Sequence, residues 1–335
     1  MKNRLLFGLL AASLCVMFIT GFTQSATAIE LRYNNFFPPT HIQSKLAEQW
    51  CKDVEKQTNG EVKIKYFPAG VLAKPTKIYD AVETGIIDIG FEVLSYVKGR
   101  FPLLSAIDLP WGYTSGVQAT RVANGVVKKF NPKELNDTKL MFVHAHGPGL
   151  IHTRNKAINS MEDLKGLKLR GTGASALIQQ ALGATPVAAP MSKTYEMLQK
   201  GVVDGSSHPL ESNNGWKLGE VVHWVVENYS TSYTTTFGIF MNKDQWNKIS
   251  PESQKAIIAL NEKYSAMHGK AWDESDKAGL EAFKKHGGKV ITQSDATSAK
   301  WAQAVQPLFA NYVKKVDAKG IDGQKVIDFI KTEMK

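Results

Sequence analysis

Hydrophobic residues follow first the period of a strand and then the period of a helix, and this order recurs along the chain. Leu31 and Tyr33 alternate with polar neighbours, and residues 62–66 do the same, so both segments are predicted strands. Between them, apolar residues recur every four positions, at Ile42, Leu46, Trp50 and Val54. That spacing gives one apolar helical face. Strands that alternate with helices in this way are typical of a parallel sheet covered by helices.

One pattern occurs twice, 116 residues apart, as IYDAVETGIIDIG at 78–90 and TYEMLQKGVVDGS at 194–206. Each copy predicts a helix that is stopped by a glycine, Gly85 or Gly201, and followed by a short apolar strand. The strand and helix order also restarts near residue 139. We therefore interpret the repetition as a duplication of whole lobes, because its period is too long for a solenoid.

A long helix is predicted in the last third of the chain. Ser250, Pro251 and Glu252 form a helix start, with a cap, a proline at the first position and an early acid. Few helix breakers follow before Gly287, and a helix of ~35 residues would run ~50 Å, longer than one small domain. We expect it to lie along both lobes, unless Gly269 or Gly279 bends it.

The expected domain organisation follows from these elements. Residues 1–28 form a signal peptide, 29–138 form lobe I with part of 237–285, and 139–228 form lobe II with the C-terminal helices of 286–335. Residues 229–285 provide a crossing strand and the lobe-spanning helix. The segments 124–136 and 229–236 are expected to act as hinges.

The N-terminus has the pattern of a cleavable export signal. Lys2 and Arg4 precede an apolar run over 5–19, and a small-residue site ends at Ala28. A retained membrane anchor is the alternative, but this run is shorter than the ~20 residues that a spanning helix needs. Cleavage leaves 307 of the 335 residues, with Cys51 as the one remaining cysteine, so no internal disulfide is expected.

The net charge of the chain excludes few classes of function. Loss of Lys2 and Arg4 lowers the net charge from +10 to about +8, a balance that often indicates nucleic-acid binding. Here basic and acidic residues are interspersed without an Arg/Lys tract, and an exported protein meets little nucleic acid. We expect no nucleic-acid partner, and at most some attraction for anionic ligands.

Two similar lobes would enclose a cleft, and ligands of parallel sheets bind beyond the carboxyl ends of strands. Glu92 and His208 each lie four residues after the matched aspartates Asp88 and Asp204. If the lobes are duplicated, Glu92 and His208 are expected to face each other across the cleft. The alternative is that both lie on ordinary surface loops.

Arg170 ends an apolar strand and is followed by a glycine-rich helix start through Thr172 and Ser175. A guanidinium offers a rigid two-pronged donor for a carboxylate, and amides at a helix start add donors beside it. Arg170 and the loop through Ser175 are therefore candidates to bind an anionic ligand. The alternative is an ion pair between Arg170 and an acid of its own lobe.

Other chemistries find less support. His144, His146 and His152 are clustered, and His144 and His146 share a strand face, so a metal-binding periplasmic protein is an alternative. No H-E-x-x-H or paired CxxC motif accompanies them, and His146 could instead border the cleft. No G-x-S-x-G elbow, local Cys–His signature or phosphate loop is present. We expect no enzymatic activity, no resident metal and no cofactor.

Linked motifs over essentially the whole mature chain resemble one family. The segment TRNKAINSMEDLKGLKLRGTG (153–173), followed by YEMLQKGVVDG and FMNKDQW, strongly resembles the substrate-binding subunit of TRAP transporters (tripartite ATP-independent periplasmic transporters, DctP-like). YNNFFPPTH, VEKQTNGEVKIKYFPAGVL and ETGIIDIGF fit the same family. The resemblance implies a two-lobed α/β periplasmic binding protein, with a ligand cleft between the lobes and a long helix that spans both. It also implies delivery of a small organic acid to sodium-driven integral membrane subunits, without an ATPase.

The same resemblance implies roles for individual residues, and at some positions this chain departs from the family pattern. It implies that Arg170 clamps the ligand carboxylate, that His208 stands where an asparagine is usual, and that Glu92 lines the cleft. Members that bind sugar acids often carry a second arginine where this chain has Leu150. We therefore expect a monocarboxylate with an apolar or aromatic body. A short keto or hydroxy acid and an amino-acid-like ligand remain alternatives.

Apolar walls for such a ligand could come from several residues, namely Phe36, Phe37, Phe91, Trp111, Met191 and Trp216. Phe36 and Met191 are favoured by their places in the family pattern. Ser212, next to Trp216 in sequence, completes the predicted ligand-binding set.

Overall fold

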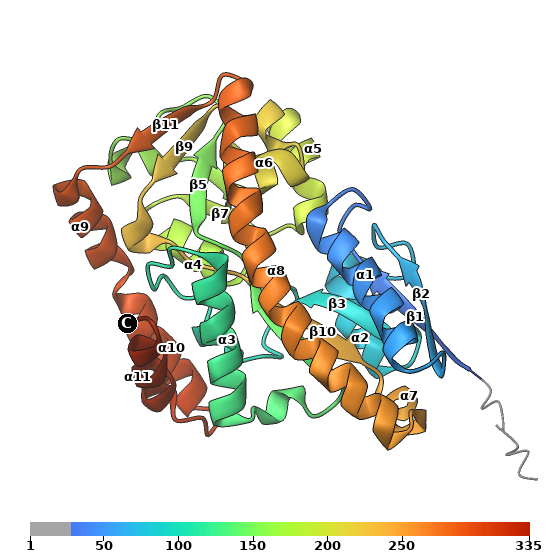
Figure 1. Ribbon diagram of the computed structural model, residues 1–335. Coiled ribbons are helices and arrows are strands. Elements are labelled where there is room, and N and C mark those ends of the chain that lie inside the picture. The colour runs from blue at the N-terminus through green and yellow to red at the C-terminus, as the bar shows by residue number, and fades with distance from the viewer. Residues whose placement is uncertain (1–27) are drawn as a thin grey trace, which may run out of the picture.

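Two separate β-sheets form the frame of the protein (Figure 1). The structure is a computed structural model that describes residues 28–335, so the signal segment predicted over 1–28 lies almost entirely outside it. The first sheet has the order β2-β1-β3-β10-β4, formed by Val62–Phe67, Ile29–Asn35, Ile89–Val93, Thr236–Met241 and Lys139–Ala145. The second has the order β11-β9-β5-β8-β6-β7, formed by Lys289–Thr292, Trp224–Glu227, Gly149–Thr153, Gly205–Pro209, Lys168–Arg170 and Thr185–Val187. Each sheet belongs to one lobe.

Helices cover both sheets. In chain order they are α1 (Ile42–Gln57), α2 (Ile78–Glu83), α3 (Gly116–Phe130), α4 (Gly173–Ala181), α5 (Thr194–Gln199), α6 (Ser212–Gly215), α7 (Lys243–Lys248), α8 (Pro251–Lys285), α9 (Asp295–Val305), α10 (Pro307–Asp317) and α11 (Gly323–Glu333). The predicted apolar face of α1 is confirmed in part, since Trp50 and Val54 are fully buried while Ile42 is exposed. One large apolar cluster fills the first lobe and two smaller clusters fill the second. This two-lobed α/β architecture was predicted.

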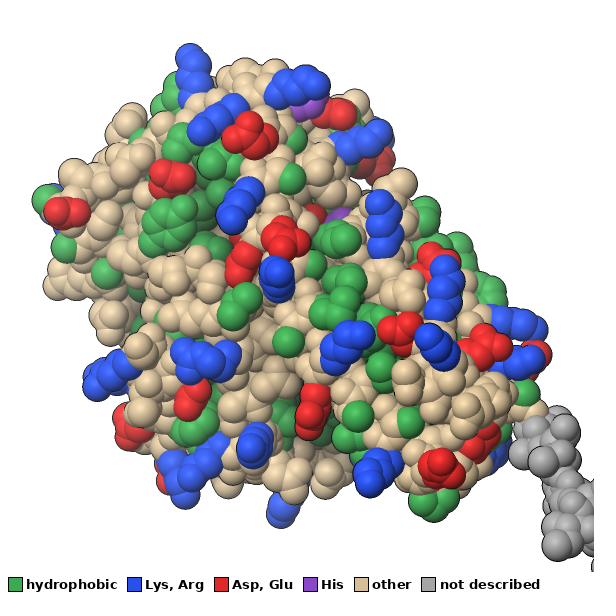
Figure 2. Space-filling view, in the orientation of Figure 1, with side chains coloured by type: hydrophobic (Ala, Val, Ile, Leu, Met, Phe, Trp, Pro, Cys, Tyr) green, Lys and Arg blue, Asp and Glu red, His purple; other side chains and the backbone are tan. Residues whose placement is uncertain are grey.

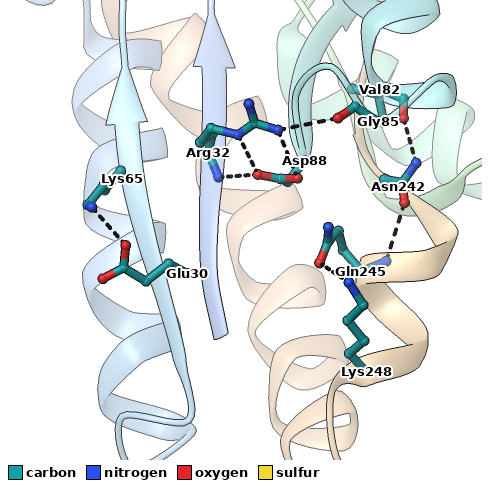
Figure 3. A network of polar contacts seen from close by, with 9 residues as sticks. All are labelled: Glu30, Arg32, Lys65, Val82, Gly85, Asp88, Asn242, Gln245 and Lys248. Atoms are coloured by element: carbon teal, nitrogen blue, oxygen red, sulfur yellow. Dashed lines mark hydrogen bonds and ion pairs between the residues drawn. The ribbon is translucent and has the colours of Figure 1, made fainter. Parts of the chain in front are cut away.

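The duplicated sequence pattern builds the same local structure in both lobes. Gly85 and Gly201 follow the short helices α2 and α5 with φ of +74° and +71°, a conformation that favours glycine. In the first lobe the Asp88 backbone N–H donates to the Arg32 carbonyl over 3.2 Å, and the Arg32 N–H donates to the Asp88 carboxylate over 2.7 Å (Figure 3).

The second lobe repeats this pairing at its own aspartate. The Asp204 N–H donates to the Lys168 carbonyl over 2.7 Å, and the Lys168 N–H donates to the Asp204 carboxylate over 2.8 Å. Each aspartate thus satisfies both backbone groups of a residue on the neighbouring parallel strand and fixes where the next strand enters the sheet.

The long helix α8 is confirmed, with 35 residues and the predicted cap, because the Ser250 hydroxyl accepts from the Ser253 N–H over 3.3 Å. It packs on α1, α3 and β4 of the first lobe and on α6 of the second (Figure 1). Neither glycine interrupts it. Gly269 lies against Thr120 of the first lobe and Gly279 lies against the Leu210 carbonyl of the second.

The lobe boundaries differ from those predicted. The strand β4, expected to open the second lobe at residue 139, pairs with β10 in the first sheet, because β10 runs antiparallel between β3 and β4 and uses the ladder groups of both. In 286–335, β11 joins the second sheet, but α10 and α11 bury Tyr312 and Ile330 in the first-lobe core.

The crossings between lobes are also partly different. Residues 229–236 connect β9 to β10 and so run between the sheets as expected. Residues 124–136 lie in α3 and the turn after it, within the first lobe, so the hinge expected there is wrong. The chain also crosses at the short connection 146–148 between β4 and β5, along α8, and between α9, which packs in the second lobe, and α10, which packs in the first.

Charges of both signs are interspersed over the face that Figure 2 shows, in agreement with the absence of a basic tract in the sequence. Within residues 28–335, no helix is both long enough and apolar enough to cross a bilayer.

The contact of α8 with the second lobe gives a stability prediction. A Cβ at Gly279 would lie 2.0 Å from the Leu210 carbonyl oxygen, which is backbone and cannot turn aside. We expect Gly279→Ala to destabilise the protein by about 1–3 kcal/mol through overpacking, measured as a lower melting temperature.

Gly125→Ala in α3 is the matched control. Its Cβ would make ordinary contacts at 3.5 Å, so the substitution should stabilise by roughly 0.5–1 kcal/mol through helix propensity. An unchanged melting temperature in Gly279→Ala would contradict the close packing of α8 on the second lobe.

Candidate functional site

A small cavity lies between the two lobes. The first lobe contributes the segment after β1 and the end of β3, including Phe36, Phe37 and Val93. The second contributes the ends of β6 and β8, including Arg170 and His208. The cavity therefore lies where the sequence placed it, at the carboxyl ends of parallel strands that face each other.

Arg170 lines this cavity and is only 4 % exposed. Its Nε donates to the Ala189 carbonyl over 2.8 Å, and Nη2 donates to the Tyr96 hydroxyl over 3.3 Å. In the part of the chain that the structure describes, no carboxylate pairs with Arg170, so the alternative of an acid from its own lobe is not observed. A buried guanidinium without a counter-ion is costly, and the remaining N–H groups are available to an external anion.

Tyr96 is a site residue that the sequence analysis missed. It ends the short turn after β3 in the first lobe, yet its hydroxyl oxygen accepts from Arg170 and from the Met191 N–H (2.8 Å) of the second lobe. Burial raises the pKa of Tyr96, so the hydroxyl keeps its proton. Within residues 28–335, the Tyr96 hydroxyl donates its proton to no acceptor. The one sequence signal was its position just beyond the carboxyl end of a strand.

Aromatic side chains form the cavity walls. Phe36 stacks on Trp216 with ring centroids 6.2 Å apart, and both line the cavity with Met191, as predicted. Phe37 also lines it, together with Phe237 and Trp272.

Two predicted wall residues lie elsewhere. Phe91 is fully buried in the first-lobe core, where it packs on His144 and lies behind Phe36 and Phe37, which line the cavity. Trp111 donates from Nε1 to the Ala106 carbonyl over 2.7 Å and packs on Phe309.

His208 lies one residue before the end of β8 and lines the cavity, fully buried. Its ring stacks on His152 at 3.8 Å, and neither ring nitrogen has a hydrogen-bond partner among the described residues. Burial lowers the pKa of His208 well below its ordinary range, so the ring is neutral and offers one donor and one acceptor. His146 also lines the cavity, with its pKa lowered by burial to about 4.

Glu92 does not line the cavity, contrary to expectation. Adjacent side chains of a strand point to opposite faces, and on β3 the cavity residue is Val93. The Glu92 carboxylate accepts from the backbone N–H groups of Tyr79 and Val93, both over 2.8 Å, and so caps the start of α2. Burial raises the pKa of this carboxyl group. Glu92 and His208 therefore do not face each other, and Glu92 holds a helix in place.

The hydroxyl residues divide between structure and cavity. Thr172 lines the cavity and caps α4. The Ser175 hydroxyl does not reach the cavity, because it accepts from the Thr172 N–H and donates to the Thr172 carbonyl. Ser212 lines the cavity and donates to the Glu211 carboxylate over 3.0 Å.

The histidine cluster does not form a metal centre. His144 lies outside the cavity, and its Nδ1 accepts from the Trp272 indole over 3.0 Å while its ring stacks on His268. His146 Nδ1 bonds the Gly147 carbonyl. Over residues 28–335 there is no group of three or more histidine, cysteine, aspartate or glutamate side chains that could hold a metal ion.

Glu211 is a second charged cavity residue that the sequence analysis missed. Its Oε1 lies 2.5 Å from Nε2 of His41, which caps α1 in the first lobe, and both side chains are buried. Its backbone N–H donates to Asp276 of α8 over 2.8 Å. No motif marked either residue, since His41 and Glu211 are 170 positions apart.

Comparison with known proteins agrees with this geometry. The family described as bacterial extracellular solute-binding protein, family 7 (DctP), matches residues 33–315. The chain belongs to this family. Its members are periplasmic solute-binding proteins of TRAP transporters, which are substrate-binding receptors and not enzymes.

Three solved structures show how similar this solute-binding protein is to its relatives. A TRAP periplasmic solute-binding protein from Desulfovibrio salexigens is 33% identical, with 91% of this chain and 95% of that chain covered and a TM-score of 0.80. A marine metagenome protein specific for aromatic acid ligands, in complex with 3-hydroxybenzoate, is 31% identical (92% and 98% covered, TM-score 0.85). A protein from Rhodoferax ferrireducens with copurified benzoate is 26% identical (92% and 98% covered, TM-score 0.86).

Asp276 of α8, which accepts from the Glu211 backbone, leads to a prediction of how stability depends on pH. Burial raises the pKa of Asp276 from its ordinary 3.8 to about 8, and the neighbouring charges of Glu211 and Asp273 add to this. Between pH 4 and pH 8 the folded protein then holds a proton that the unfolded chain has lost, so the Asp276 contribution falls as pH rises. Asp276→Asn keeps the oxygen that accepts from Glu211 but does not titrate. We expect its melting temperature, relative to wild type, to rise between pH 5 and pH 9.

Asp328→Asn, a substitution on the exposed face of α11, serves as the control and should show no such trend. A melting-temperature difference for Asp276→Asn that is constant with pH would contradict a protonated Asp276.

Proposed function

We propose that this protein captures a small monocarboxylate with an apolar or aromatic body in the periplasm and delivers it to a sodium-coupled TRAP membrane transporter. The observation that carries the proposal is the buried Arg170 guanidinium, which lines an aromatic-walled cavity and has no carboxylate partner in the described chain. A ligand carboxylate is the counter-ion that this arrangement lacks.

The carboxylate would be held from both lobes. Arg170 of the second lobe supplies the free guanidinium N–H groups, and Tyr96 of the first lobe supplies its hydroxyl proton. Charge-assisted hydrogen bonds of this kind are roughly twice as strong as neutral ones, and the low dielectric of the cavity strengthens them. His208, with two unpartnered ring nitrogens, is positioned to bond a further polar group of the ligand.

The body of the ligand would lie among aromatic rings. Phe36, Phe37 and Trp216 give flat apolar surfaces, and aromatic pairs gain roughly 0.5–1.5 kcal/mol beyond the burial of their area. The relative that is specific for aromatic acids and the one with copurified benzoate support the same ligand class.

Ligand binding would favour the closed form. Tyr96 touches Arg170 and Met191 only because the two lobes meet around the cavity, so a carboxylate bound by Tyr96 and Arg170 stabilises that arrangement over an open one. The crossings at 146–148 and 229–236 would permit the motion. Family membership supports integral membrane subunits as partners, and the sodium coupling is part of the proposal.

Removal of the guanidinium tests the proposal. Arg170→Ala should weaken binding of benzoate or 3-hydroxybenzoate by at least ~2 kcal/mol, about 30-fold, because a buried charge pair loses one partner. Arg170→Lys keeps the charge but loses the two-pronged donor, so its affinity should lie between those of wild type and Arg170→Ala. Calorimetric titration measures all three proteins.

Arg121→Ala, which removes an exposed arginine paired with Glu333, should leave the affinity unchanged. Near-normal affinity in Arg170→Ala would end the assignment of Arg170 as the anchor.

The absence of a second arginine predicts selectivity. Leu150 pairs with His208 in the strand register but is buried in an apolar cluster of the second lobe and supplies no charge. We therefore expect sugar diacids such as glucarate to bind poorly. A thermal-shift screen of sugar diacids, aromatic acids, pyruvate and lactate checks this expectation. Diacids as the strongest stabilisers would refute it, and pyruvate or lactate in first place would favour the short-acid alternative.

A further inference from the structure

The ligand cavity contains a charged group of each sign, and only the positive one is explained by a ligand carboxylate. Glu211 lines the same cavity as Arg170 and is 2 % exposed. Its partner His41 comes from the first lobe and Glu211 from the second, so their contact exists only when the lobes are together.

The hydrogen bonds of His41 locate the charge. Its Nδ1 accepts from the Gln43 backbone N–H over 3.2 Å and so carries no proton. The ring proton must then be on Nε2, which faces Glu211 Oε1, so the ring is neutral and donates to a carboxylate. The pair as a whole carries one negative charge, and Glu211 carries it.

The carboxylate has capacity left. His41 donates to Oε1 and the Ser212 hydroxyl donates to Oε2 over 3.0 Å. Two carboxylate oxygens offer about four acceptor positions, so about two remain for a group in the cavity. A buried anion of this kind is stabilised by each further donor that reaches it.

A run of ring contacts leads from the neighbour of Arg170 to the partner of Glu211. Tyr96, next to Arg170, contacts Phe36 at 6.1 Å between ring centroids, and Phe36 contacts Phe37 at 4.3 Å. Phe37 in turn contacts His41, the partner of Glu211, at 4.4 Å. The order along the wall is thus guanidinium, rings, carboxylate.

We infer that Glu211 binds a hydrogen-bond donor, a hydroxyl or an ammonium group, which the ligand carries on its body away from its carboxylate. This inference rests on the proposed function, because it takes the carboxylate to be at Arg170. A ligand with a donor at its far end satisfies both buried charges at once, whereas a bare monocarboxylate leaves Glu211 facing an apolar ring. Specificity of this kind is large because a buried polar group left unpaired is penalised.

The donor end would also report closure. Arg170 and Tyr96 join the lobes through one contact, and Glu211 and His41 join them through a separate one. A ligand that reaches both of them bonds to two contacts that form only between the lobes. It is therefore expected to hold the closed form better than a shorter acid does.

Matched acids test the inference. Calorimetric titrations compare benzoate with its 3- and 4-substituted hydroxy, methoxy and aminomethyl derivatives, in wild type and in Glu211→Gln. The methoxy group matches the hydroxyl in position but cannot donate. In wild type, at least one hydroxy or aminomethyl isomer should bind at least about tenfold more tightly than its methoxy counterpart, the scale of one hydrogen bond to a charged group.

Glu211→Gln can keep its one acceptor oxygen on His41 and turn its NH2 group to Ser212, whose hydroxyl can accept, while the charge is removed. It should weaken binding of the best aminomethyl acid at least about tenfold, because the ammonium group of that acid is attracted to the Glu211 charge. The affinity for benzoate, which has no such group, should be unchanged or higher. Glu220→Gln, in an exposed glutamate of the same lobe that bonds Tyr195, should alter neither.

Three results would overturn the inference: methoxy acids that bind as tightly as hydroxy acids, benzoate as the tightest ligand of wild type, or an equal loss for every acid in Glu211→Gln. The last would show that Glu211 only holds the lobes together. Arg170→Ala, run beside these variants, separates the two proposals. If it abolishes binding while Glu211→Gln does not discriminate between acids, the proposed function stands and this inference fails.

Discussion

The buried guanidinium of Arg170, which has no paired carboxylate in the described chain, is the feature on which the rest of the site depends. Arg170 is almost completely enclosed, yet among residues 28–335 its side chain bonds only a carbonyl and a phenol. Such a guanidinium is stable only if an anion arrives or if the surrounding dipoles are fixed in its favour. The neutral histidines, the aromatic walls and the closure of two lobes all contribute to a water-poor environment in which one carboxylate becomes the favoured partner.

The lobes themselves are held rigid by means that do not involve the ligand. The matched aspartates Asp88 and Asp204 each satisfy the backbone of a neighbouring strand, and this explains why one sequence pattern is written twice. Glu92 has a similar structural role at the start of α2, where it satisfies backbone donors. Rigid lobes are what allow small side-chain contacts at the cavity to select between an open and a closed arrangement.

Much of this could be predicted from the sequence because it rests on local chemistry. Periodicity and caps gave α8 and its start at Ser250, and the strand end before Gly171 gave Arg170. The position of Glu92 was predicted wrongly because a sequence repeat indicates where a residue lies along a strand. The repeat does not show to which side of the sheet the side chain points. Tyr96, His41 and Glu211 were missed because their importance comes from contacts between lobes, and these arise from segments with no shared motif. The membership of β4 was misjudged for the same reason, since its partner β10 is about a hundred residues away in the chain.

The continuous helix α8 restricts the route by which a solute can enter. It runs along both lobes, presents Gly269 to one and Gly279 to the other, and places Trp272 in the cavity wall between them. Because the α8 backbone packs this closely against each lobe, the two lobes have little room to move apart on the side of α8. We therefore expect the two lobes to separate on the side opposite α8 and the solute to enter from that side.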